Sequence, residues 1–283
     1  YGEFNFAKLR ERVKVAVKYL DRVIDINFYP TEEAASSNAR WRPVGLGLMG
    51  LQDVFFMKRL AYDSPEALRL SARIQEEIYY AALSTSCDLA IEEGAHPSFP
   101  QTRTAQGVLQ FDLWGVSPEI NTDSGQLGLF GRRQENRWDA LKRRIQKHGL
   151  RNSLLIAIAP TATIASVTGC YECTEPMGSN LFKRETLSGE FLQINRYLVA
   201  DLKRLGLWTE RIRDLIKEGE GSIQHIAEIP PELRNLYRTA WELPQKALID
   251  MAAARSPYID QSASLNLFMA SPTKIGRASC RER

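Results

Sequence analysis

Apolar residues recur three or four positions apart at the start of the chain, which is typical of the buried face of a helix. The spacing predicts a helix over residues 5–26, with these residues on that face: Phe6, Leu9, Val13, Val17, Leu20 and Ile24. A second long helix is expected over 64–93, because Ser64, Pro65 and Glu66 form a capped, proline-initiated, acidic first turn. Shorter helices are predicted over 51–60, 134–148, 186–206, 209–218, 232–242 and 244–255.

Uninterrupted apolar runs predict buried strands instead. The clearest run is 154–159, and residues 43–50, apolar and rich in glycine, suit a strand or a tight turn into a helix. A strand-like patch at 108–114 lies within the irregular segment 97–133, and 264–269 is expected to be a last strand. Single strands interleaved with helices favour an α/β fold with a largely parallel sheet, forming one domain or part of one.

The strand predicted at 154–159 runs directly into Pro160 and Thr161, which indicate the start of a helix. The first N–H groups of a helix have no partner within it, so such a corner can seat an anion, typically a phosphate. The turn lacks the glycine-rich loop and lysine of a Walker A motif, so phosphate would be held by backbone amides. Many such turns bind nothing, and that alternative stays open at this point.

Composition excludes several classes of protein. The 283 residues are 44% hydrophobic and 25% charged, which is ordinary for a globular chain. A net charge of +3 gives no basic footprint for nucleic acid, and the basic cluster is expected to be the solvated side of a helix: Arg132, Arg133, Lys142, Arg143 and Arg144. No apolar run approaches the roughly 20 residues that span a bilayer. Four cysteines make no disulfide framework, so a cytoplasmic location is expected.

Residues 45–50 match the dinucleotide-binding pattern G-x-G-x-x-G letter for letter. That fingerprint needs a preceding strand and an acidic residue closing a second strand about 20 residues later. Residues 36–42 are polar, and 62–66 are predicted to be a turn and a helix start. Close backbone packing is therefore favoured, and a dinucleotide-dependent oxidoreductase is the weaker alternative.

Two further pairs of residues could carry chemistry. Cys170 and Cys173 have the spacing of half a zinc site or of a redox pair, but no second ligand pair exists, so structural thiols are favoured and no metal site is predicted. Tyr79 and Tyr80 could relay a radical, but their place inside a long helix favours core packing. Glu172 and Glu175 flank the cysteines. Because carboxylates would repel a phosphate, both are expected to point away from the turn or to bond backbone.

The chain resembles the large (α) subunit of class I ribonucleotide reductase. The segment 154–166 and the run Leu-Phe-Lys-Arg-Glu-Thr-Leu-Ser-Gly-Glu-Phe at 181–191 carry the resemblance. Shorter stretches match in order along the chain: 25–30, 42–47, 151–157, 258–262 and 264–266. Residues 170–176 look like those of bacterial members.

The resemblance implies that residues 1–272 are the C-terminal part of the barrel domain, half of a ten-stranded α/β barrel. It implies thiyl-radical reduction of ribonucleoside diphosphates to deoxyribonucleoside diphosphates for DNA synthesis. The substrate phosphates would be held by the backbone amides and Thr hydroxyls of the turn: Thr161, Ala162, Thr163 and Ile164. Implied partners are a small (β) radical-generating subunit with its metal cofactor, thioredoxin or glutaredoxin, nucleotide effectors such as ATP, and a second α subunit.

The family's catalytic cysteine lies in an Asn-x-Cys-x-Glu pattern, which this sequence lacks. The resemblance therefore implies that no catalytic residue, no reducing cysteine pair and no cofactor of its own lies in this chain, which is expected to be an inactive fragment of the enzyme. Residues 275–283 resemble a translated sequencing adapter, and 273–283 are expected to be a disordered artefact. A non-catalytic phosphate- or nucleotide-binding module is the alternative.

Overall fold

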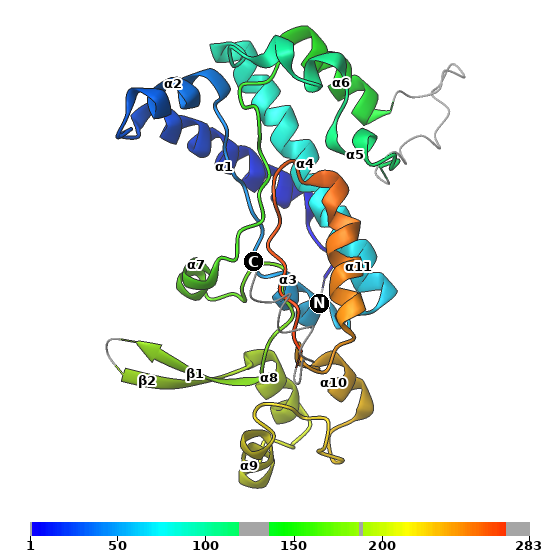
Figure 1. Ribbon diagram of the computed structural model, residues 1–283. Helices are drawn as coiled ribbons and strands as arrows, with labels where there is room; N and C mark the ends of the chain where they lie inside the picture. The colour runs from blue at the N-terminus through cyan, green and yellow to red at the C-terminus, as the bar shows by residue number, and fades with distance from the viewer. Residues whose placement is uncertain (1, 119–135, 187–188, 270–283) are drawn as a thin grey trace, which may run out of the picture.

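The computed structural model describes residues 2–118, 136–186 and 189–269, and most of them are helical (Figure 1). The sheet found in this part of the chain has two strands, which form an antiparallel hairpin. The predicted parallel sheet is not formed as a continuous sheet among the described residues. Parallel pairing occurs there only as isolated bridges between extended segments.

Two long helices form the centre of the larger core and lie where the sequence predicts them. α1 spans Phe6–Ile26 and α4 spans Pro65–Glu93. Ser64 caps α4 by accepting a hydrogen bond from the N–H of Ala67 at 3.2 Å, as the sequence indicates. Val13 and Val17 of α1 are buried in the core that α1 shares with α4.

Three short elements follow or separate these helices. α3 (Leu51–Lys58) confirms the prediction over 51–60. α2 (Glu32–Trp41) was not predicted, because it buries none of its residues and so shows no apolar spacing. The patch at 108–114 is not a strand but contains α5 (Gln110–Leu113), whose Asp112 accepts the N–H of Leu109 at 2.7 Å. That side-chain bond stabilises a helical turn that hydrophobicity alone does not indicate.

The predicted helix over 186–206 is wrong in its first half. β1 (Leu181–Thr186) pairs with β2 (Gly189–Ile194), from Leu181 opposite Ile194 to Thr186 opposite Gly189. Because most of β1 lies upstream of the predicted helix, spacing within that window could not indicate the pairing. The second half is helical as α8 (Arg196–Arg204), which Asn195 caps by accepting the N–H of Tyr197.

The remaining helices lie close to their predicted positions. α6 (Arg137–His148) confirms the helix over 134–148 from its first described turn, and α9 (Glu210–Glu218) follows its cap at Thr209. α10 (Pro231–Leu236) begins as predicted but ends six residues earlier than expected. α11 (Gln245–Arg255) confirms the last helix.

Three extended segments run parallel through the middle of the molecule, and they position the site. Residues 154–158 lie in the centre, with 44–46 on one side and 260–264 on the other. The N–H of Val44 donates to Leu154 O at 3.0 Å, and the N–H of Ser264 donates to Ile158 O at 2.8 Å. The strand predicted over 264–269 is not formed. Pairing with the middle segment is limited there to the bridge at Ala263 and the N–H of Ser264.

The apolar side chains form two cores. The larger lies among α1, α4, α6 and α11 and includes the middle extended segment. The smaller lies among α8, α9 and α10 and receives Phe56 from α3. In the part of the chain that the structure describes, no helix combines the length and apolar character needed to cross a membrane.

Candidate functional site

The predicted phosphate turn follows the carboxyl end of the middle extended segment. Thr161 has a φ of 57°, in the left-handed region, and α7 (Ala162–Thr168) begins immediately after it. The N–H of Ala165 donates to Thr161 O at 2.9 Å, so the N–H groups of 162–164 precede the first bond within the helix. These three residues are exposed, with 53% of Ile164 accessible. The turn is therefore open to solvent and is not covered by neighbouring side chains.

Thr161 holds the turn against the loop that follows α7. Its Oγ1 accepts the N–H of Cys173 at 2.8 Å, which leaves the hydroxyl proton free to donate to a ligand. This contact compensates a backbone conformation that β-branched residues rarely adopt. Thr161 thus anchors the turn to Cys173 and can also donate a hydrogen bond to a ligand.

Within the described ranges, neither cysteine of the Cys-x-x-Cys pair belongs to a metal-binding group. Cys173 is fully buried, and burial raises the pKa of its thiol. Cys170 is half-buried, with its Sγ 3.2 Å from the Oγ1 of Thr168. The described residues contain no group of three or more side chains that could hold a metal ion. Burial of Cys173 fits the structural interpretation, because a buried thiol of raised pKa is unreactive.

The two carboxylates beside the cysteines behave differently from each other. Glu175 is buried and accepts the N–H of Asn266 at 3.2 Å, which confirms that it bonds backbone. Burial raises the pKa of Glu175 above its usual value. Glu172 is exposed and lines a neighbouring cavity.

That neighbouring cavity has a volume of about 760 Å³ and lies at the other end of α7 from the turn. Ser166 and Gly169 bring α7 to its wall, together with Asp53 of α3, Arg196 of α8 and Trp241. Asp53 accepts the N–H of Tyr171 at 2.6 Å and pairs with Arg196 at 3.3 Å. Residues 161–164 are not among the lining residues, so the structure does not join the turn to this cavity.

The glycine-rich segment packs closely against the middle extended segment. A Cβ at Gly47 would lie 2.9 Å from Ala157 O, and one at Gly45 would lie 3.3 Å from the Cβ of Ala157. Such a distance at Gly47 is too short for any side chain. The glycines therefore permit close backbone approach, which confirms the packing interpretation.

The tyrosine pair lies in the core, as predicted. Tyr79 is 2% exposed, accepts the N–H of Gln110 at 3.3 Å, and has a pKa raised by burial. The ring of Tyr80 meets Trp138 edge-on at 5.1 Å between centroids, and the guanidinium of Arg137 lies 4.0 Å from the centre of the Tyr80 ring. Both rings thus serve packing between α4 and α6.

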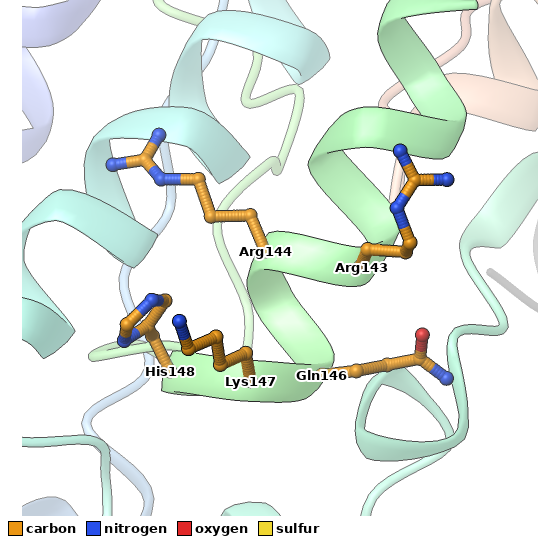
Figure 2. Close-up of a pocket in the computed structure, with 5 residues that line it drawn as sticks. All are labelled: Arg143, Arg144, Gln146, Lys147 and His148. Carbon is orange, nitrogen blue, oxygen red and sulfur yellow. The ribbon is translucent and has the colours of Figure 1, made fainter. Parts of the chain in front are cut away.

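The described members of the basic cluster, Lys142, Arg143 and Arg144, lie on α6. Figure 2 shows that Arg143 and Gln146 point to one side of the helix and Arg144, Lys147 and His148 to the other. These five residues line one pocket. Arg144 pairs with Asp88, and Lys142 pairs with Asp112 at 2.7 Å. Arg132 and Arg133 lie outside the described residues. Arg143 is exposed, as the prediction of a solvated helix side requires, but Lys142 and Arg144 are half-buried and link α6 to other helices, so the prediction holds only in part.

Sequence reasoning missed Asp260, whose carboxylate binds the backbone at the start of the middle extended segment, at the opposite end from the turn. Its two oxygens accept the N–H groups of Leu155 at 3.0 Å and Ile156 at 2.7 Å. Burial raises the pKa of Asp260 to about 6. The distance of more than 100 residues between these partners explains why no local pattern revealed the contact.

Comparison with known proteins identifies the family. The sequence model of the family described as "Ribonucleotide reductase, barrel domain" matches residues 1–279. The ribonucleoside-diphosphate reductase large chain of Schizosaccharomyces pombe is 45% identical over 272 residues, which is 96% of this chain and 32% of that protein. The large subunit from Trypanosoma brucei brucei is 47% identical over 277 residues, again 96% of this chain and 32% of that protein.

A solved structure supports the same fold. The class Id ribonucleotide reductase alpha subunit of Actinobacillus ureae superposes with a TM-score of 0.68 at 24% identity, covering 92% of this chain and 41% of that one. The chain spans about a third of the length of the curated relatives it matches. By sequence, it belongs to the ribonucleotide reductase family and corresponds to part of the large subunit's barrel domain.

Proposed function

We propose that this chain is the part of a ribonucleotide reductase large subunit that holds the phosphates of the substrate. The whole protein would reduce ribonucleoside diphosphates to deoxyribonucleoside diphosphates, the activity after which its relatives are named. A large subunit implies a small one. We propose that the small subunit generates the radical with its metal cofactor, that thioredoxin or glutaredoxin supplies electrons, and that nucleotide effectors and a second large subunit bind elsewhere.

The phosphate site proposed within this chain is the turn Thr161, Ala162, Thr163 and Ile164. The observation that carries the proposal is the exposure of this turn at the carboxyl end of the middle extended segment, with three backbone N–H groups ahead of the first bond of α7. A phosphate would accept hydrogen bonds from these groups and from the hydroxyls of Thr161 and Thr163. A seat of this kind orients a nucleotide whose affinity comes mainly from other contacts.

We further propose that the three extended segments belong to one half of a ten-stranded α/β barrel. The parallel bridges from Leu46 to Ile156 and from Ile158 to Ala263 support this arrangement. The barrel description of the matching family supports it too. The cysteines and the glutamate that carry out the chemistry would then lie in other parts of the large subunit, so this chain would have no activity alone.

A charge reversal in the turn tests the phosphate assignment. In a full large subunit carrying this chain, Thr163→Asp places a carboxylate where a phosphate oxygen would bind. We expect the KM for a ribonucleoside diphosphate to rise by about tenfold or more. The new carboxylate repels the phosphate, and the substitution also removes the Thr163 hydroxyl that would donate to it. Steady-state kinetics at fixed effector concentration measure the change.

The matched control is Thr168→Asp, at the other end of α7. Thr168 is also exposed, so this variant adds the same charge to the same helix away from the seat. We expect its KM to stay within about twofold of the parent value, because surface charges on the far side are screened. An unchanged KM in Thr163→Asp, or equal effects in the two variants, would refute the assignment of the turn.

A further inference from the structure

A second cavity lies at the opposite end of the extended segments from the phosphate turn. It has a volume of about 480 Å³, and Pro43, Leu154 and Asp260 line it where the three segments begin. The turn follows the other end of the middle segment, beyond Ala159. This cavity, called the Asp260 cavity below, is therefore separate from the proposed substrate site and does not depend on it.

The wall of the Asp260 cavity comes from several parts of the chain and combines apolar with polar side chains. The polar lining residues are Ser37, Thr102, Arg103, Thr104, Gln110, Asn152, Ser153 and Asp260. α2 contributes Trp41 and α4 contributes Tyr79 and Leu83. The segment around α5 and the residues leading into the middle segment supply other apolar side chains: Val108, Leu109, Leu113, Leu150 and Leu155. A cavity of a few hundred Å³ that combines apolar side chains with polar groups is typical of small-molecule sites.

Asp260 gives this cavity a charge. The carboxylate lines the cavity while accepting the N–H groups of Leu155 and Ile156. Among the described residues, no ion pair links Asp260 to a cation, and Arg103, which also lines the cavity, is exposed. A half-buried carboxylate that faces no cation is costly, and its partial loss of solvent raises its pKa to about 6. A cationic ligand would remove that cost.

We propose that the Asp260 cavity binds a small ligand with an aromatic body and one primary ammonium group. The ammonium group lies against the carboxylate of Asp260 and uses the lone pairs that the two backbone N–H groups leave free. The aromatic body packs against Trp41, Tyr79 and Leu83. Two aromatic residues in the wall favour a planar ligand over a branched aliphatic one.

Benzylamine is the probe that tests this proposal, with benzyl alcohol as its neutral counterpart of the same size. At about pH 8, above the pKa of about 6, Asp260 is ionised. We expect saturable binding of benzylamine by calorimetry, about tenfold tighter than benzyl alcohol, as one charge-assisted hydrogen bond provides. The amide resonances of Leu155 and Ile156 are expected to shift during the titration, because their acceptor contacts the ligand.

Two variants separate the charge from the shape of the cavity. Asp260→Asn is expected to bring the affinities of benzylamine and benzyl alcohol within about twofold of each other. Val108→Trp fills the cavity from a half-buried position and is expected to abolish binding of both probes. The control Val167→Trp makes the same change at a site on α7 that is 84% exposed and should leave both affinities unchanged.

Three outcomes would show that the Asp260 cavity does not bind such a ligand. Equal affinity for the two probes in the parent chain, or benzylamine binding that Val108→Trp leaves intact, would overturn it. Shifts confined to amides away from Leu155 and Ile156 would also overturn it. If Asp260→Asn does not fold, Val108→Trp and the comparison of the two probes still decide the outcome.

Discussion

The two ends of the extended segments differ in what their backbone N–H groups do. At the carboxyl end, the turn 161–164 exposes its N–H groups beside small side chains. At the amino end, the carboxylate of Asp260 accepts the N–H groups of Leu155 and Ile156 next to the Asp260 cavity. One continuous segment therefore carries open donors at one end and satisfied donors at the other.

This difference separates stability from binding. Satisfied and buried groups contribute to the free energy of unfolding, because exposing them loses packing and hydrogen bonds. Open donors in contact with water contribute little to stability but are available to a ligand. We therefore expect substitutions at the amino end to change stability and substitutions at the turn to change binding.

The sharpest test of that separation compares Leu155→Ala with Thr163→Ala. Leu155 is 1% exposed, so removing its side chain leaves a cavity in the larger core. We expect a loss of about 3 kcal/mol in the free energy of unfolding for Leu155→Ala and a change within about 0.5 kcal/mol for Thr163→Ala. Urea unfolding followed by circular dichroism measures both, and comparable losses would contradict the comparison.

A pH series tests the amino end more specifically. The pKa of Asp260 is raised from 3.8 to about 6, so between these values the folded chain holds a proton that the unfolded chain has lost. Stability should therefore fall as the pH rises from about 4 to about 7, by up to about 3 kcal/mol from this group. The measurement is the urea midpoint of the parent chain minus that of Asp260→Asn at each pH, since other groups titrate alike in both. A difference that stays constant with pH would refute the contribution of Asp260.

The smallest expected effect concerns Thr161, which belongs to both sides of the comparison. Thr161→Val removes the oxygen that accepts the N–H of Cys173 but keeps the shape of the side chain. We expect a loss of about 1 kcal/mol in the free energy of unfolding. Thr161→Ser retains the hydroxyl and should keep most of that stability. Equal losses in both variants would show that the hydrogen bond to Cys173 is not what matters.

Helices with strong local signals could be predicted from the sequence. Ser64 and Pro65 mark the start of α4, and Thr209 marks that of α9, because capping depends only on nearby residues. α2 and α5 were missed because capping side chains, and not an apolar face, define them. The hairpin of β1 and β2 was missed because strand pairing depends on residues outside any helical window.

The candidate site was only partly visible in the sequence. Pro160 and Thr161 end an apolar run, and that local pattern placed the turn and the start of α7 correctly. The role of those residues in holding a phosphate stays a prediction. The contact of Asp260 with Leu155 and Ile156 joins residues far apart in the chain, so only the folded structure reveals it.

The contact made by Asp260 also has a geometric consequence. A slip of one residue between 260–264 and the middle segment would turn the N–H groups of Leu155 and Ile156 away from the carboxylate and leave them without an acceptor. The carboxylate thus fixes how far the middle segment extends beyond its neighbour. The position of Thr161 along the segment direction therefore depends on the side chain of Asp260, which lies at the opposite end of the middle segment.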